Sequence, residues 1–160
     1  MISYCYVDTC VLSDILKQYN SGNPNNSLTA SKFIKSRILI ELNKAIDSSG
    51  DDAMIITSIF SFIELINKFH EIFRETKIEP LHLYSFLKQP LAWITIEDLT
   101  QYISLFLCDV PQTTLNGEPI SGDDAIHIAT AMSRGEKINF CTTDTKLEQL
   151  SINNITFITN

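Results

Sequence analysis

Apolar positions along the chain fall into short continuous runs and into longer stretches with helical spacing. The runs are β-prone and predict five strands, over residues 2–7, 53–57, 91–96, 138–142 and 155–159. Residues with helical spacing predict helices over 9–18, 28–46, 59–73, 81–88, 97–108 and 121–134, with Gly135 closing the last. Turn-forming residues fill 20–27 and 48–52, and 111–122 is expected to be an irregular loop.

The alternation of strands and helices predicts the fold class. Strands joined through helices pair in parallel by right-handed crossovers. We therefore expect one three-layer α/β/α domain over residues 1–160, with a mostly parallel five-stranded sheet. With 44% apolar residues in a chain of 160, a substantial core is expected.

Composition narrows the class of protein and its compartment. No apolar run approaches the ~20 residues of a membrane span, and the first residues do not resemble a secretory signal. The four cysteines lack zinc-ligand spacing, which favours a reduced, cytoplasmic location: Cys5, Cys10, Cys108 and Cys141. A net charge of −7 argues against a protein that coats nucleic acid by positive charge alone, although bound divalent cations would offset part of it.

Four acids fall where a parallel sheet places its ligands. Asp8 follows the first predicted strand, and Asp144 lies just past the fourth. Asp124 begins the helix that leads into the fourth strand, and Glu64 lies in the helix after the second. Ligands of open parallel sheets bind outside the carboxyl ends of the strands, so these four side chains are expected at one cleft.

The three aspartates also have a purely structural interpretation. Asp8 could cap the helix that begins after it. Ser121 and Asp124 have the spacing of a capping box, with Asp in place of the commoner Glu. Asp144 could cap a short helix through Leu147.

Glu64 is the more informative acid, because it does not begin a helix. Its structural alternative is an ion pair with Lys68, worth only ~0.3–0.5 kcal/mol on a surface. Clustered carboxylates destabilise a fold unless a cation compensates, and Mg²⁺ and Mn²⁺ prefer oxygen ligands. The acids together therefore favour a divalent metal site.

Four segments, in order, resemble the PIN domain, a small nuclease domain found in many bacterial toxins of toxin–antitoxin pairs and in RNA-processing enzymes. They are Val7-Asp-Thr-Cys-Val-Leu12, Thr57-Ser-Ile-Phe-Ser-Phe-Ile-Glu-Leu65, Asp124-Ala-Ile-His-Ile-Ala-Thr-Ala131 and Phe140-Cys-Thr-Thr-Asp144. The third is the most specific, and together they run through nearly the whole domain.

The resemblance implies an active site, its cofactor and its partners. It implies four catalytic, metal-binding acids, namely Asp8, Glu64, Asp124 and Asp144, supported by Thr9 and Thr142. Asp123 is an additional acid that departs from the family pattern, and it is expected to support the site as a helix-start charge or an outer-shell ligand. It also implies one or two Mg²⁺ or Mn²⁺ ions and endonucleolytic cleavage of RNA. An antitoxin partner and a homodimer are expected on the same ground.

Two further residues and several alternatives remain open. Lys146 is a candidate for contacting substrate phosphate, by proximity to Asp144 alone. His127 shares a helix face with Asp124 and is interpreted as structural, with a general base as the alternative. The competing functions are a catalytically silent PIN-like module that binds RNA or protein, a DNA-directed nuclease, and a phosphotransferase of the haloacid dehalogenase type. The last needs a second Asp where Cys10 stands.

Overall fold

A computed structural model describes residues 4–20, 36–49, 55–68, 94–97 and 101–159 of the chain. The strands are β1 (Tyr4–Val7), β2 (Ile55–Ser58), β3 (Ile94–Glu97), β4 (Ile138–Cys141) and β5 (Ile155–Ile158). The helices are α1 (Thr9–Asn20), α2 (Ser36–Ser49), α3 (Ile59–Asn67), α6 (Gln101–Leu107), α7 (Gly122–Ser133) and the short 3₁₀ helix η3 (Thr145–Gln149).

The five strands form one sheet in the order β3-β2-β1-β4-β5, and every pairing is parallel. The chain adds strands outward from β1 to β3 and then returns to the other side of β1 with β4 and β5. The strand order therefore reverses between β1 and β4. In open α/β sheets, the crevice at the carboxyl ends of the strands on either side of such a reversal is the usual ligand site.

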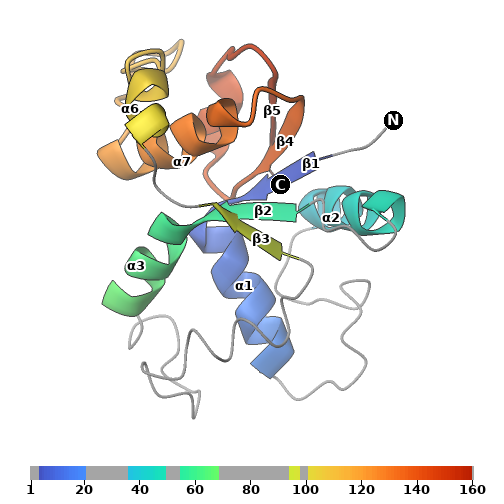
Figure 1. The fold of residues 1–160 in the computed structure, drawn as a ribbon. Coiled ribbons are helices and arrows are strands. Elements are labelled where there is room, and N and C mark those ends of the chain that lie inside the picture. Colours follow the sequence, from blue (N-terminus) through green and yellow to red (C-terminus); the bar gives the residue numbers. More distant parts are fainter. Residues whose placement is uncertain (1–3, 21–35, 50–54, 69–93, 98–100, 160) are drawn as a thin grey trace.

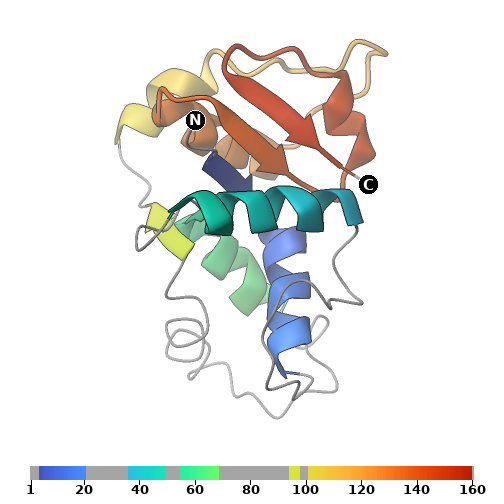
Figure 2. The same ribbon diagram turned by 90° about the vertical axis from the view of Figure 1, so that its right-hand side faces the viewer.

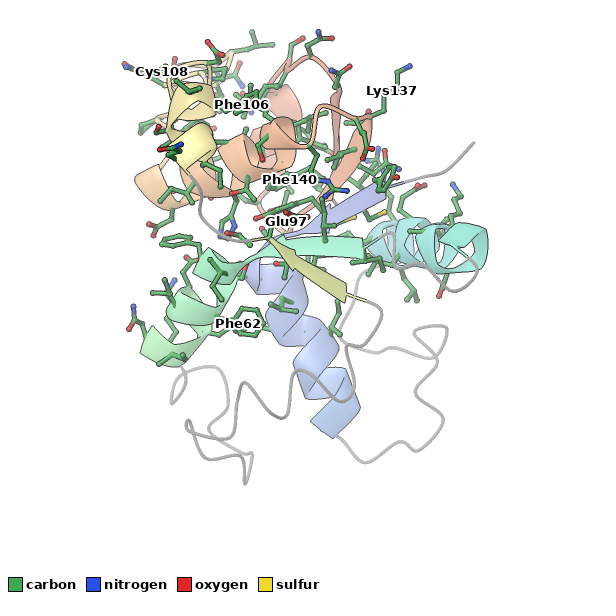
Figure 3. All side chains as sticks on the ribbon, viewed as in Figure 1. Phe62, Glu97, Phe106, Cys108, Lys137 and Phe140 are labelled. Atoms are coloured by element: carbon green, nitrogen blue, oxygen red, sulfur yellow. The ribbon has the colours of Figure 1, made fainter. Side chains whose placement is uncertain are left out.

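Two apolar clusters cover the two faces of the sheet and make the expected three layers (Figure 1). Side chains alternate along β1, so Cys5 and Val7 pack against α1, α2 and α3, whereas Tyr6 packs on the side of α6 and α7. Figure 3 shows Phe62 between α3 and α1, and Phe140 on the opposite side of the sheet. In the turned view of Figure 2, α2 runs crosswise to α1 below β4 and β5.

The predicted fold class is confirmed, with shifts at several element ends. Glu97 was expected to begin a helix but ends β3, because it pairs with Ser58 in the parallel ladder. Helix α2 continues through Ser49, beyond the break expected from residue 48. Gly135 follows α7 with a φ of 70°, a backbone conformation that glycine adopts readily and that ends helices.

Some expectations lie outside the described residues. These are the helix predicted over 81–88, the helical positions Phe69 and Phe73, and all but the first residue of the loop predicted over 20–27. That first residue, Asn20, is instead the last residue of α1. Within the part of the chain that is described, no helix has both the length and the apolar composition needed to cross a membrane.

Candidate active site at the carboxyl edge of the sheet

Asp8 lies at the carboxyl end of β1, immediately before α1, and is only 8% exposed. Its Oδ1 accepts a hydrogen bond of 3.0 Å from the backbone N–H of Val11, so the predicted helix cap is present. Burial raises the pKa of the Asp8 carboxyl to about 6, although hydrogen bonds from Thr142 and Val11 act in the opposite direction. A carboxylate that is costly to ionise is therefore built into the centre of the sheet edge.

Thr142 connects Asp8 to the segment after β4. Its fully buried hydroxyl donates to Asp8 Oδ2 at 2.5 Å and accepts from the backbone N–H of Asp144 at 3.0 Å. One hydroxyl thus links the residues that follow β1 and β4 by two hydrogen bonds. These two strands lie on either side of the point where the strand order reverses.

Replacement of Thr142 by valine should lower the free energy of unfolding by about 2 kcal/mol or more, because a buried acceptor and a buried donor lose their partner together. The pKa of Asp8 should rise further, since the Thr142 bond lowers it. Urea unfolding measures the first effect and a pH titration of stability the second. Thr142→Ser keeps the hydroxyl and removes only the methyl group, so as the control it should lose less stability than the valine variant. A valine variant as stable as wild type would show that the two hydroxyl bonds do not stabilise the fold.

Asp124 and Asp144 meet at the ammonium group of Lys146. Lys146 Nζ lies 3.0 Å from Asp124 Oδ2 and 2.9 Å from Asp144 Oδ2. Ion-pair contacts with Asp144 and Asp124 raise the pKa of Lys146. Both aspartates lie at helix starts as predicted: Ser121 caps α7 by accepting from the N–H of Asp124, and Asp144 caps η3 by accepting from the N–H of Lys146.

Glu64 points toward the sheet edge and is held there from two other elements. Its Oε2 accepts a hydrogen bond from the hydroxyl of Thr9 on α1 and lies 2.7 Å from His127 Nε2 on α7. Burial acts to raise the pKa of Glu64, but the bonds from His127 and Thr9 outweigh it and the pKa is lowered. Lys68, the expected surface partner, is exposed and contributes only a weaker favourable charge.

Tyr6 completes this arrangement from beneath. Its hydroxyl lies 2.8 Å from His127 Nδ1, and both side chains are buried. Because the Glu64 carboxylate can only accept, the proton of a neutral His127 ring lies on Nε2, and Nδ1 then accepts from Tyr6. The order Tyr6–His127–Glu64 therefore runs from the core of the sheet to its edge.

The predicted residues are thus arranged in two hydrogen-bonded groups. Asp8, Thr142, Asp144, Lys146 and Asp124 form one continuous set of contacts, and the charge of Asp124 also raises the pKa of Asp8. The second group contains Glu64, Thr9, His127 and Tyr6.

Asp123, the remaining predicted site residue, is exposed, whereas Tyr6, which the sequence analysis did not identify, is fully buried. Asp123 is exposed in the first turn of α7, and no contact among the described residues joins it to the four acids. Tyr6 was missed by sequence reasoning, because in a strand of apolar residues it looks like an ordinary core residue. His127 was interpreted as structural from its position on the helix. That position does not predict its two partners, Tyr6 and Glu64, because they lie on β1 and α3.

The donor set suits a hard divalent cation, since every acid at the edge offers carboxylate oxygen. Among the described residues, however, no three His, Cys, Asp or Glu side chains stand together in a way that could hold an ion. A cation does bridge two of the acids, namely the ammonium of Lys146 between Asp124 and Asp144. The carboxylate oxygens therefore suit a divalent metal, and Asp124 and Asp144 are free to bind it once the Lys146 ammonium has left them.

Comparisons with known proteins are informative at the level of structure. No family model matches the sequence, and no curated protein matches it. A chain of the DNA-bound VapBC structure from Salmonella typhimurium superposes with a TM-score of 0.55 and 15% identity, over 98% of this chain and 97% of that chain.

Two further structures are similar over comparable lengths. VapBC2 from Rickettsia felis, bound to a DNA fragment from its promoter, gives a TM-score of 0.56 and 15% identity over 97% of each chain. A toxin–antitoxin complex from Klebsiella pneumoniae gives 0.50 and 16% over 95% of each chain. At such identities the likeness establishes the fold alone. The chain therefore has the α/β fold of proteins from these toxin–antitoxin complexes, as its resemblance to PIN domains predicted.

Proposed function

We propose that this protein is a Mg²⁺- or Mn²⁺-dependent endoribonuclease that hydrolyses RNA phosphodiester bonds, of the kind that serves as the toxin of a toxin–antitoxin pair. The fold supports the proposal, because the similar structures are VapBC and other toxin–antitoxin complexes. The reaction class rests on the side chains at the carboxyl edge of β1 and β4, since a fold alone does not specify chemistry.

The orientation of Glu64 carries the proposal. A helix cap explains each of the three aspartates, so their presence at strand ends is weak evidence for a metal site. Glu64 has no such explanation, yet only 13% of its side chain is exposed and it is held toward α7 by His127 and Thr9. A glutamate drawn inward at the edge that carries Asp8 is expected of a ligand site and not of a solvated helix face.

The four acids are proposed to hold one or two ions. When bound, Mg²⁺ or Mn²⁺ supplies Lewis acidity and positive charge beside the scissile phosphate. Asp8, fixed by Val11 and Thr142, is the anchor at the centre of the edge. Glu64 is restrained through Oε2, which leaves Oε1 for a ligand, and Asp124 and Asp144 approach from α7 and β4. Asp144 is assigned the orientation of the attacking water or of a second ion.

The silent PIN-like module is the second candidate, and one observation favours it. Lys146 already contacts Asp124 and Asp144 and offsets one of their two negative charges without any metal, and structural acids would behave in the same way. The two candidates differ in whether a divalent cation binds at this edge and whether RNA is cut.

Glu64→Gln should reduce RNA cleavage by roughly 100-fold or more, because losing a positioned acidic group of a catalytic site typically costs about that factor. The fold should persist, since the amide oxygen of Gln still accepts from Thr9. The assay compares labelled single-stranded RNA and DNA of one sequence with Mn²⁺, with Mg²⁺ and with EDTA. Cleavage of RNA with Mn²⁺, and none with EDTA, is expected of the wild-type protein.

The matched control is Glu118→Gln, which neutralises an exposed glutamate in the loop before α7 and should leave cleavage unchanged. Equal cleavage by wild type and Glu64→Gln would remove Glu64 from the site. No cleavage of either nucleic acid by folded wild-type protein with both metals would favour the silent module, and cleavage of DNA alone would replace the substrate class.

An antitoxin partner, a homodimer and a cytoplasmic location are part of the same proposal. The similar structures are complexes, which supports a protein partner for this chain as well. Light scattering of the purified chain tests the homodimer.

A further inference from the structure

The ammonium of Lys146 contacts two of the four acids at close range. It lies within 3.0 Å of one oxygen from each of two carboxylates, Asp124 and Asp144, on two different elements. Arg37 and Lys44 each pair with a single glutamate and are more than half exposed, whereas the Lys146 side chain is 28% exposed. Arg134 also contacts two carboxylates, but it lies 2.8 Å from Glu97 and 3.7 Å from Glu136, so only one of its two contacts is close.

The backbone of Lys146 is held firmly beneath this contact. The residue lies in η3, whose next residue, Leu147, is buried in the core. The N–H of Lys146 donates to Asp144 Oδ1 at 3.1 Å, and the N–H of Leu147 donates to the carbonyl of Asp144. Because the main chain is fixed, only the side-chain torsions have to be ordered for the ammonium to reach the two acids, so this contact costs less entropy than a pair between two mobile chains.

An ammonium and a divalent cation compete for the same carboxylates. Two positive charges a few ångströms apart repel one another, and Asp124 Oδ2 and Asp144 Oδ2 are already engaged. The contact holds two of the four acids around nitrogen, and no metal-ligand group is formed among the described residues.

We propose that Lys146 is an internal counter-cation that occupies the position between Asp124 and Asp144, and that its displacement sets the affinity of the site for divalent metal. The inference rests on the proposed function for the identity of the metal site. Without metal, Lys146 compensates the acids and preserves the fold. With metal, its ammonium is released from both carboxylates, and metal binding is weaker than the four acids alone would provide.

The test is Lys146→Met, which retains an unbranched apolar chain and removes the charge. Its affinity for Mn²⁺, measured by electron paramagnetic resonance of the free ion at constant ionic strength, should be about 10-fold higher than that of wild type, the order expected when two partly exposed ion pairs need not be broken. Its melting temperature in EDTA should be lower than that of wild type, and Mn²⁺ should raise it by more.

Two control variants show whether the change in Mn²⁺ affinity comes from losing the charge of Lys146, from altering its side chain, or from removing any positive charge. Lys146→Arg keeps the charge and should keep an affinity close to that of wild type. Lys137→Met removes an exposed charge before β4, at the opposite end of that strand from Asp144, and should change neither affinity nor stability (Figure 3).

The outcomes distinguish this inference from the proposed function. Equal Mn²⁺ affinities of wild type and Lys146→Met, or weaker binding by the variant, would overturn the competition while leaving the metal site in place. If neither protein bound Mn²⁺ while both were folded, the metal site itself would be overturned and the inference with it.

Discussion

Asp8→Asn is expected to make the protein more stable at neutral pH and to remove its cleavage of RNA. The reason for the first effect is that Asp8 is buried, and that burial raises its pKa from 3.8 to about 6. Asparagine should retain the bond from Val11 through its Oδ1, and its amide can donate to the Thr142 hydroxyl in place of the bond that Thr142 donates to Asp8. The substitution therefore removes the buried charge while keeping the cap.

The direction of the pH dependence follows from the raised pKa. Below the unfolded-state pKa of Asp8 the carboxyl is neutral in both states, and no penalty is paid. As pH rises from the unfolded-state pKa to about 6, the unfolded state gives up this proton before the folded state does, and stability is lost up to an amount on the order of 3 kcal/mol. The gain from Asp8→Asn should accordingly be small near pH 4 and largest above about pH 7.

Urea unfolding in EDTA at about pH 4.5 and about pH 7.5 measures this gain. Neutralising any acid reduces the self-repulsion of a chain with a net charge of −7, so a control is needed. Asp109→Asn neutralises an exposed acid after α6 and should show little of the pH-dependent gain. An Asp8→Asn protein that is less stable than wild type at the higher pH would contradict the assignment, and retained Mn²⁺-dependent cleavage would exclude Asp8 from the catalytic site.

Replacement of His127 by alanine should lower the free energy of unfolding by roughly 3 kcal/mol or more. It removes a buried ring, leaves a cavity, and deprives the buried Tyr6 hydroxyl of its partner. It also removes one of the two donors that hold Glu64, so the pKa of Glu64 should rise. Urea unfolding measures the first effect, and carboxyl NMR titration of Glu64 the second.

A double-mutant cycle with Tyr6→Phe separates the hydrogen bond from the cavity. Tyr6→Phe removes the hydroxyl alone and should cost about 1 kcal/mol. In the His127→Ala background the same change should cost less, because the partner is already absent, with a coupling of about 1 kcal/mol. Strict additivity would show that Tyr6 and His127 do not form the bond, and an unchanged pKa of Glu64 would show that His127 does not position it.

The acids were predictable because they depend on local spacing. An aspartate directly after a β-prone run caps the next helix and lies at the carboxyl end of a strand whatever the rest of the chain does. Asp8 satisfies both conditions, Asp144 caps η3 a short distance past the end of β4, and Asp124 follows its capping serine at the expected distance. The resemblance to PIN domains predicted Thr142 as a residue that supports the site, and its hydroxyl donates to Asp8.

The sequence by itself determined the strand and helix pattern, the parallel sheet, and the acids that lie at its edge, because periodicity and capping are local properties. The tertiary structure decided the strand order and the partners of Glu64 and Lys146. Glu64 contacts His127, 63 residues away, and not its helical neighbour Lys68. Lys146 joins Asp124 to Asp144 only because β4 lies beside β1 and α7 begins at the same edge. Such contacts depend on how the elements pack, which no local pattern specifies.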